Sequence, residues 1–340
     1  MKKGLKVTLI SLSAVVATAL LTLSIMVLPH KGLAGVILDN MRISTMSYSK
    51  ETYTGTTHLD VQYSDISETD TLDLYIPKDV KNPKLMVLIH GGGFYYNDSR
   101  SRQARFMYEH FSNEYAVASI NYRLSNEAKF PAAVHDVKSA LRFLTYNSTT
   151  YGYDANDLII WGESAGGYLA TMATLSPDAE YGDVPFIGED KVVDPIHYDI
   201  GTLLDYYGLL QIESFPEQYK QLDIPNWLTT LVGNDMNNNS DDSLMCKFFG
   251  EKVCDMSEDK LSEINSMSRI AQNSQYDFNV YIAHGTSDIT VPYLQSTSFE
   301  EKIKNHTTGK VVLDLKEHYK HADDRFYTSY NLSSMSEIFK

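Results

Sequence analysis

The sequence has few cysteines and a shortage of basic residues, and each shortage excludes classes of protein. Only two of the 340 residues are cysteine, and no histidine lies near them at the spacing of a metal site. Lys and Arg total 29 against 44 Asp and Glu, which gives a formal net charge of −15. An acidic chain of this kind argues against nucleic acid and anionic lipid as partners. With 43% hydrophobic residues, the chain has enough apolar material for one large globular domain.

The two cysteines lie close together, as Cys246 and Cys254 in "CKFFGEKVC". In an exported protein, a pair this close favours a disulfide that closes a short loop. The alternative is two reduced cysteines that pack as small hydrophobic residues. Both interpretations stay open at this level, and we expect neither a metal nor a cofactor.

Long hydrophobic runs are also scarce, because one run alone reaches the length of a membrane span. It extends from Val7 to Leu28, follows three lysines and carries no charge. As a helix it would rise about 33 Å, whereas the apolar stretch of a signal peptide has about 7–15 residues. The small residues of "KGLAG" just downstream offer a cleavage site. We predict that residues 1–35 are an N-terminal membrane anchor or a signal peptide, that the body lies outside the cytoplasm, and that it contacts membrane only through this segment.

After the leader, short apolar runs with the composition of strands alternate with helical patterns. Following Pro131, the residues Val134, Val137, Leu141 and Leu144 are spaced for one buried helix face. This alternation predicts an α/β fold with a mostly parallel sheet and helices on both faces. The predicted strands are Leu72–Pro77, Lys84–His90, Tyr115–Tyr122, Asp157–Trp161, Gly201–Gly208, Phe278–Gly285 and Lys310–Glu317.

The alternation fails between about residues 208 and 275, where the sequence is more helical and more polar. We interpret this stretch as a small helical cap that is inserted over the carboxyl edge of the sheet. The rest of residues 36–340 would then form a single domain.

One predicted strand runs directly into a serine that is surrounded by glycines. Gly162-Glu163-Ser164-Ala165-Gly166 has the pattern G-x-S-x-G and is followed by a helical sequence. A nucleophilic serine on a tight strand-to-helix turn needs small neighbours, and the first N–H groups of the helix favour a developing oxyanion. We therefore predict that Ser164 is a nucleophile, with a plain glycine-rich connection as the alternative. Glu163, at the variable position, would either tune this site or simply be solvated.

A second glycine-rich stretch, His90-Gly91-Gly92-Gly93, follows an earlier strand. Consecutive glycines let backbone N–H groups approach a substrate oxygen with no side chain between them. A phosphate-binding loop would need a different glycine spacing. We predict an oxyanion hole in which Gly92 and Gly93 act together with Ala165. The aromatic residues that follow, Phe94, Tyr95 and Tyr96, would line a substrate pocket or pack beneath the cap.

Four segments, "HGGGF", "NYRLSNEAKFPAAVHDVKSALRFL", "WGESAGG" and "HGTSDITVP", make residues 72–326 resemble the hormone-sensitive-lipase-like, acetyl esterase branch of the α/β-hydrolases. The resemblance implies an α/β-hydrolase catalytic domain over residues 36–340, with an acid and then a histidine following the serine. Asp288 matches the acid. His321, followed by a small and then an acidic residue, matches the histidine, with His318 as the alternative. His284 precedes the acid, and we expect it to be structural.

The resemblance further implies a serine carboxylesterase that hydrolyses short-chain, acetyl-like esters of small molecules or carbohydrates through an acyl-enzyme. Such an enzyme needs no metal and no cofactor. Two alternatives stay open: an arylformamidase or peptidase with the same fold, and an inert hydrolase-fold binding protein. The natural acyl group, the alcohol and the oligomeric state do not follow from these residues.

Overall fold

The computed structural model describes residues 53, 55–177, 180–192, 194–224, 241–270 and 275–340. The predicted leader, residues 1–35, lies outside the described residues. Within the ranges given above, no helix is both long enough and apolar enough to cross a membrane.

The described chain contains an eight-stranded sheet with the order β1-β2-β4-β3-β5-β6-β7-β8. β2 pairs antiparallel with β1 and with β4, and all the other neighbours are parallel. The mostly parallel sheet that the sequence predicts is therefore confirmed. The polar edge strand β1 is the one that its composition does not predict. The strands are β1 (Thr56–Gln62), β2 (Thr71–Ile76), β3 (Lys84–Ile89), β4 (Ala116–Ile120), β5 (Asp154–Glu163), β6 (Ile200–Tyr206), β7 (Asn279–Gly285) and β8 (Val311–Lys316).

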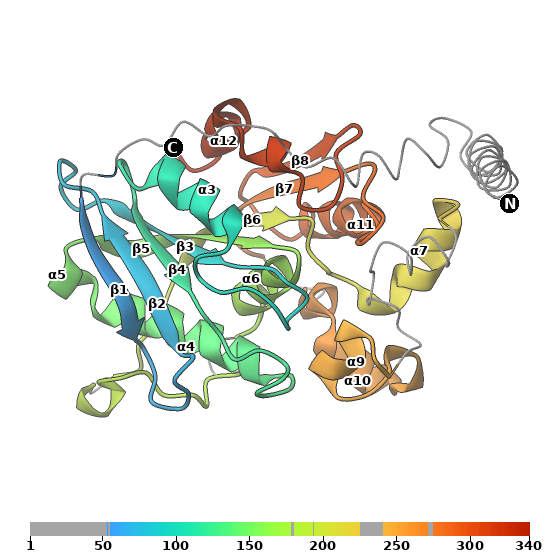
Figure 1. Cartoon of the computed structure of the whole chain (residues 1–340), viewed down its shortest axis with the longest axis horizontal. Coiled ribbons are helices and arrows are strands. Elements are labelled where there is room, and N and C mark those ends of the chain that lie inside the picture. The colour runs from blue at the N-terminus through green and yellow to red at the C-terminus, as the bar shows by residue number, and fades with distance from the viewer. Residues whose placement is uncertain (1–52, 54, 178–179, 193, 225–240, 271–274) are drawn as a thin grey trace, which may run out of the picture. The chain divides into compact units, whose positions relative to one another are not determined.

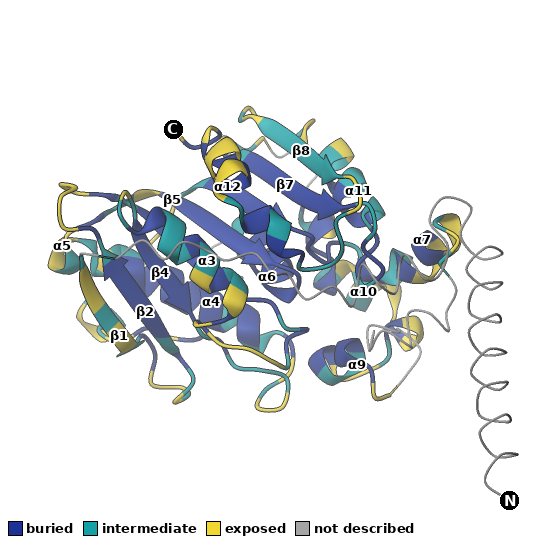
Figure 2. Cartoon of the chain, turned by 45° about the horizontal axis from the view of Figure 1, so that its top comes forward, coloured by how far each residue is buried: buried dark blue, intermediate teal, exposed yellow. Residues whose placement is uncertain are grey.

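Each face of the sheet has a hydrophobic core of its own, because successive side chains of a strand point to opposite faces. In β3, Leu85, Val87 and Ile89 belong to one core, and Met86 and Leu88 belong to the other. Burial on both faces explains why the inner strands read as continuous apolar runs. The first core includes residues of the helices α4 (Ala132–Tyr146), α6 (Ala165–Leu175) and α11 (Leu294–Ile303), and the second those of α3 (Arg102–Phe111) and α12 (Ser329–Ser336) (Figures 1 and 2).

The sheet brings the predicted site segments together. β3 ends at Ile89, β5 at Glu163 and β7 at Gly285, and a predicted site segment follows each of them. The carboxyl ends of parallel neighbouring strands meet at one edge of the sheet. The glycine-rich loop, Ser164 and the segment of Asp288 therefore start from the same edge.

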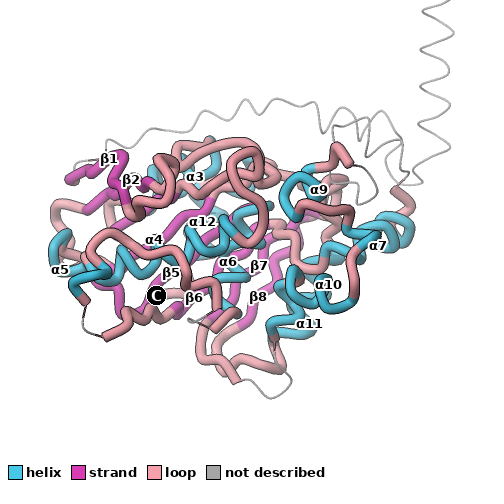
Figure 3. The backbone as a smooth tube through the Cα atoms, turned by 90° about the horizontal axis from the view of Figure 1, so that it is seen from below, coloured by secondary structure: helices cyan, strands magenta, loops and turns pink. Residues whose placement is uncertain are grey.

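Between β6 and β7 the described chain is helical, with short helices gathered at one end of the sheet (Figure 3). They are α7 (Phe215–Gln221), α9 (Leu244–Phe249) and α10 (Glu258–Ile264), with the 3-10 turns η2 (Ile212–Ser214), η3 (Val253–Asp255) and η4 (Ser266–Arg269). The carbonyl oxygen of Phe248 accepts the N–H of Phe130 at 2.8 Å, and that of Ile264 accepts the Tyr168 hydroxyl at 2.7 Å. These bonds tie the inserted helices to α6 and to the segment before α4. Their action as a cap stays a prediction.

The cysteines are not joined, so the disulfide interpretation is wrong. Cys246 is half-buried within α9, whereas Cys254 is exposed in η3. The thiol of Cys254 lies 3.6 Å from the carboxylate of its neighbour Asp255 instead of against Cys246. Closeness in sequence was therefore a poor guide, because α9 and η3 place the two side chains in different surroundings.

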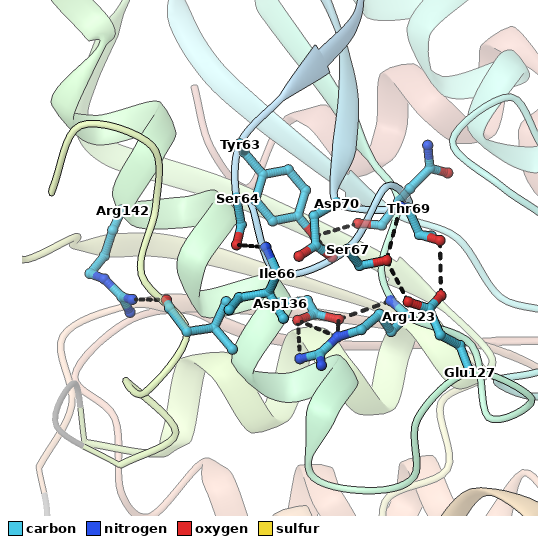
Figure 4. Close-up of polar contacts among 12 residues, drawn as sticks. Tyr63, Ser64, Ile66, Ser67, Thr69, Asp70, Arg123, Glu127, Asp136 and Arg142 are labelled. Carbon is cyan, nitrogen blue, oxygen red and sulfur yellow. Dashed lines mark hydrogen bonds and ion pairs between the residues drawn. The ribbon is translucent and has the colours of Figure 1, made fainter.

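A buried ion pair links α4 to the segment after β4 (Figure 4). The Asp136 carboxylate accepts hydrogen bonds from the backbone N–H of Arg123 at 2.9 Å and from its Nη2 at 2.7 Å. Asp136 is completely buried, and the Arg123 side chain is only 15% exposed. Nearby, burial and the charge of Asp136 raise the pKa of Asp70 to about 7, although the charge of Arg123 opposes this rise. Arg123 and Asp136 belong to "NYRLSNEAKFPAAVHDVKSALRFL", one of the segments that carry the resemblance, and the ion pair gives both residues a structural role.

We expect Asp136→Ala to lower the free energy of unfolding by about 3 kcal/mol, because it leaves the Arg123 guanidinium buried without its carboxylate. Urea unfolding followed by circular dichroism measures the loss. The matched control is Asp157→Ala, which removes an exposed pair with Lys84 and should cost about 1 kcal/mol or less. Equal losses in the two variants would contradict the structural importance of the buried pair.

Candidate active site

Ser164 lies at the corner between β5 and α6, in a backbone conformation that residues with a side chain rarely adopt. Its φ is +53° and its ψ is −118°. The corner is tightly closed: a Cβ on Gly162 would lie 2.1 Å from the carbonyl oxygen of Gly166, and one on Gly166 would lie 2.0 Å from that of Ile89. Only glycine fits at these two positions. The glycines of the motif are thus required by a corner that presents Ser164 at the start of a helix.

The loop after β3 packs against this corner. It turns at Gly92, which has a φ of +109° and whose carbonyl oxygen accepts the N–H groups of Tyr95 and Tyr96. Among the described residues, the N–H groups of Gly92, Gly93 and Ala165 donate no hydrogen bond. The loop and the start of α6 therefore offer three amide donors of the kind that can bind a substrate oxyanion.

Ser164, His321 and Asp288 form a hydrogen-bonded chain. His321 Nε2 lies 3.0 Å from Ser164 Oγ, and His321 Nδ1 lies 2.6 Å from Asp288 Oδ2. The other carboxylate oxygen of Asp288 accepts the N–H groups of Thr290 and Val291, at 2.8 and 2.9 Å. In this geometry the imidazole can take the serine proton while the carboxylate holds the imidazole in place.

His321 and Asp288 shift each other's pKa. Burial disfavours the charged imidazole, but the charge of Asp288, the hydrogen bond to it and the charge of Glu163 outweigh this effect and raise the pKa of His321. Burial alone would raise the pKa of Asp288, whereas the charge of His321 and hydrogen bonds from His284 and His321 lower it below its usual range. Asp288 is therefore ionised at neutral pH, and His321 binds a proton more readily than a free histidine does.

The turn that carries His321 is closed by Asp323, the acidic residue of the His-Ala-Asp sequence. Its carboxylate accepts the N–H groups of Lys320 at 3.2 Å and of Arg325 at 3.1 Å. Arg325 also donates from Nη2 to the carbonyl oxygen of His318 at 2.7 Å. The turn brings His321 to Ser164 and leaves His318 exposed. Of the two predicted histidines, His321 is the one that meets the serine.

His284 lies beside the acid and not beside the serine. It is fully buried, and its Nε2 lies 3.2 Å from Asp288 Oδ2 and 3.0 Å from the carbonyl oxygen of Val291. Its Nδ1 lies 2.6 Å from Ser296 Oγ on α11. These contacts fit a residue that supports Asp288.

Glu163 is buried, with 3% of its surface exposed, so the solvated alternative is wrong. Its Oε1 accepts the N–H of Gly91 at 2.9 Å. Two further residues near the site, Tyr207 and Tyr327, have no motif that marks them. The Tyr207 ring lies edge-on to the His321 ring, with 4.8 Å between centroids, and its hydroxyl lies 2.5 Å from that of Tyr327. The one signal in the sequence was that Tyr207 lies near the end of the predicted strand Gly201–Gly208, and in the structure it directly follows β6.

The aromatic residues after the glycine-rich loop do not share one environment. Phe94 is fully buried and stacks on Phe248 of α9, with ring centroids 3.8 Å apart. Tyr95 is half-buried and Tyr96 is 56% exposed. Phe94 thus packs beneath the inserted helices, whereas Tyr96 is open to solvent beside the loop.

The arrangement can carry out nucleophilic attack by a serine on a carbonyl carbon, because it combines a nucleophile, a base, an orienting carboxylate and free amide donors. In the part of the chain that the structure describes, no group of three His, Cys, Asp or Glu side chains could hold a metal ion.

The strand order, the serine after β5, the acid after β7 and the histidine after β8 define an α/β-hydrolase fold. Two solved structures share it with a TM-score of 0.67. A truncated form of a carbohydrate esterase from gut microbiota is 22% identical, over 86% of this chain and 98% of that one. A bifunctional GH43-CE protein of Bacteroides eggerthii is 24% identical, over 83% of this chain and 35% of that one. The model of the BD-FAE family matches residues 72–303, so the chain belongs to the BD-FAE family.

Curated relatives match shorter parts of the chain. Arylacetamide deacetylase-like 2 of Homo sapiens is 33% identical over 131 residues, which are 35% of this chain and 33% of that protein. Esterase LipC of Mycobacterium tuberculosis is 24% identical over 245 residues, 71% of this chain and 53% of LipC. The chain thus spans about a third and about half of the length of these two relatives.

We expect His321→Ala to abolish labelling of Ser164 by a fluorophosphonate probe, because the serine loses the base that takes its proton. His318→Ala is the matched control, since it removes an exposed imidazole three residues away, and it should label at the wild-type rate. In the wild type, the labelling rate should rise with pH through a pKa above the usual 6.5 of histidine, because the neutral imidazole is the base. Loss of labelling in His318→Ala with labelling kept in His321→Ala would reverse the assignment.

Proposed function

We propose that this chain is a serine carboxylesterase that hydrolyses short-chain, acetyl-like esters of small molecules or carbohydrates. The observation that carries the proposal is the hydrogen-bonded chain from Ser164 through His321 to Asp288 beside three free amide donors. The curated relatives named as esterases support an ester as the substrate.

The reaction would proceed through an acyl-enzyme. Ser164 Oγ attacks the ester carbonyl carbon while its proton passes to His321 Nε2, and the N–H groups of Gly92, Gly93 and Ala165 bind the oxyanion. The bond to the alcohol then breaks, and His321 gives its proton to the leaving oxygen. Water attacks the acyl-enzyme, His321 takes the proton of the water and returns it to Ser164, and the carboxylic acid leaves.

The packing around the oxyanion loop supports a short acyl group. A Cβ on Gly93 would lie 2.4 Å from Leu244 Cδ1, so α9 lies directly over this glycine. Phe94, which follows Gly93, is fully buried and stacks on the buried ring of Phe248 of α9. Bulk this close to the oxyanion donors leaves little room for a long chain beside them. The structural neighbours named as carbohydrate esterases support an ester of a sugar as one candidate substrate.

The test compares p-nitrophenyl esters from acetate to dodecanoate on the full-length chain and on Ser164→Ala. We expect turnover of acetate and butyrate to exceed that of dodecanoate by at least about tenfold, because the close approach of Leu244 to the oxyanion loop should disfavour long acyl groups. Ser164→Ala should lower kcat by at least about a thousandfold.

Other results would favour other functions. Turnover of N-aryl formamides or peptides without turnover of esters would favour the amide-cleaving alternative. Failure of the chain to react with a fluorophosphonate would leave the inert binding protein, because such a protein has no activated serine. Equal turnover of all ester lengths would overturn the short-chain part of the proposal alone.

We also propose that the chain works outside the cytoplasm, held by or released from the segment of residues 1–35. The proposal rests on the apolar run from Val7 to Leu28 and the lysines before it. A reporter enzyme that is active only outside the cytoplasm, fused after residue 340, should be active. An intact chain in the membrane fraction would favour the anchor. A shortened chain in the medium would favour a cleaved signal peptide. An inactive reporter on a stably expressed fusion would overturn the proposal.

A further inference from the structure

Glu163 connects the two halves of the candidate site. It is the last residue of β5 and precedes Ser164, while its carboxylate reaches the loop after β3. Oε1 accepts the N–H of Gly91 at 2.9 Å, and the space beside this glycine is occupied by Glu163, since a Cβ on Gly91 would lie 2.6 Å from Oε1. The oxyanion loop is thus fixed to the serine corner through one carboxylate.

Tyr207 lies near the same carboxylate and favours its charged form. The hydroxyl of Tyr207 forms a hydrogen bond with that of Tyr327, with 2.5 Å between the two oxygen atoms. Tyr327 belongs to η5 (Asp324–Tyr327), directly after the turn of His321. We call Glu163, Tyr207 and Tyr327 the Glu163 network; it joins the oxyanion loop, the end of β6 and the histidine segment.

The network also acts on His321 through charge. The groups that face His321 with a charge are Asp288 and Glu163, and both favour the imidazolium. The titratable groups that face Glu163 are Tyr122, Tyr207, Tyr327 and His321. The three tyrosines are fully buried, and burial raises the pKa of each well above its ordinary value, so they stay neutral. Burial raises the pKa of Glu163, but the N–H of Gly91 and the charge of His321 oppose this, and the ionised form of Glu163 adds a negative charge to that of Asp288.

We infer that Glu163 is a positioning residue with two tasks: its hydrogen bond to Gly91 holds the oxyanion loop in place, and its negative charge helps His321 to hold the proton taken from Ser164. The inference rests on the proposed reaction of Ser164. It assigns no contact between Glu163 and the substrate. The two tasks separate in two variants, since glutamine keeps the length of the side chain and aspartate keeps its charge.

Glu163→Gln tests the charge. The amide oxygen can still accept the N–H of Gly91, but the negative charge beside His321 is lost. The neutral imidazole is the reactive form, and Glu163 stabilises the imidazolium, so removal of its charge should let the site stay reactive at lower pH. The readout is the pH dependence of the rate at which a fluorophosphonate labels Ser164 in the full-length chain. We expect the acid limb of this profile to move to lower pH.

The matched control is Glu109→Gln, which removes one negative charge from α3. Glu109 is paired with Arg105 at 2.7 Å and has no contact with the site residues in the described structure. Its acid limb should coincide with that of the wild type. A shift in Glu163→Gln no larger than in Glu109→Gln would overturn the electrostatic task.

Glu163→Asp tests the hydrogen bond. The charge remains, but the shorter side chain withdraws from the N–H of Gly91. We expect the plateau rate of labelling to fall by at least about tenfold, because a displaced oxyanion donor no longer stabilises the developing charge, while the acid limb stays in place. A plateau rate equal to that of the wild type would overturn the positioning task. If circular dichroism shows that Glu163→Gln is unfolded, Glu163→Asp still tests whether the hydrogen bond to Gly91 positions the oxyanion loop.

The labelling readout separates the inference from the proposed function. Labelling of the wild type that is lost in Ser164→Ala shows that the serine is activated, whatever ester the enzyme prefers. If the wild type labels but hydrolyses no ester, the proposed substrate fails and the role of Glu163 is still measured. If it hydrolyses esters and the Glu163 variants behave as the wild type does, the inference fails and the proposed function stands.

Discussion

Ser164 holds a backbone conformation with a positive φ, and the surrounding segments are packed so that it cannot relax. Gly162 and Gly166 close the corner, and Ile89 at the end of β3 lies against it. The N–H of Ser164 is bonded to the carbonyl oxygen of Tyr206 in the neighbouring strand. Strain of this kind persists only where the rest of the fold over-determines the backbone, and here the parallel strands β3, β5 and β6 do so. The site residues are positioned relative to this corner.

Near Ser164, the ionisation of Asp288 and Glu163 depends on burial as much as on the groups that hydrogen bond to them. Asp288 is buried but accepts two backbone N–H groups and contacts two histidines, so it stays ionised where an isolated carboxylate would take up a proton. Burial also raises the pKa of Glu163, although the N–H of Gly91 and the charge of His321 oppose this. The charges of two carboxylates whose environments differ thus act on the imidazole. Asp288 is held by two backbone N–H groups and two histidines, whereas Glu163 accepts the N–H of Gly91.

The sequence was sufficient where the signal is local. Strands buried on both faces read as apolar runs, and Ser164, Asp288 and His321 each follow a strand in a short motif, so their segments could be found one at a time. β1 was not predicted, because an exposed edge strand carries polar residues and does not form an apolar run. Tyr207 and Tyr327 were not identified from the sequence. They contact residues of other segments, such as His321, and no spacing within one segment encodes such contacts. The prediction of a disulfide was wrong for the opposite reason. Cys246 and Cys254 are close in sequence, but the end of α9 lies between them and they do not meet in the structure.

The turn of His321 gives the molecule a weak point that is separate from its core. The turn depends on Asp323, on Arg325 and on the cation–π contact of Arg325 with Tyr319, and it lies outside the regular strands and helices. Such segments open at a lower free energy than a packed sheet. Heat should therefore disconnect the base from an otherwise intact nucleophile before the sheet melts. On warming, activity would disappear at a temperature at which circular dichroism still reports a folded chain, and it would return on cooling.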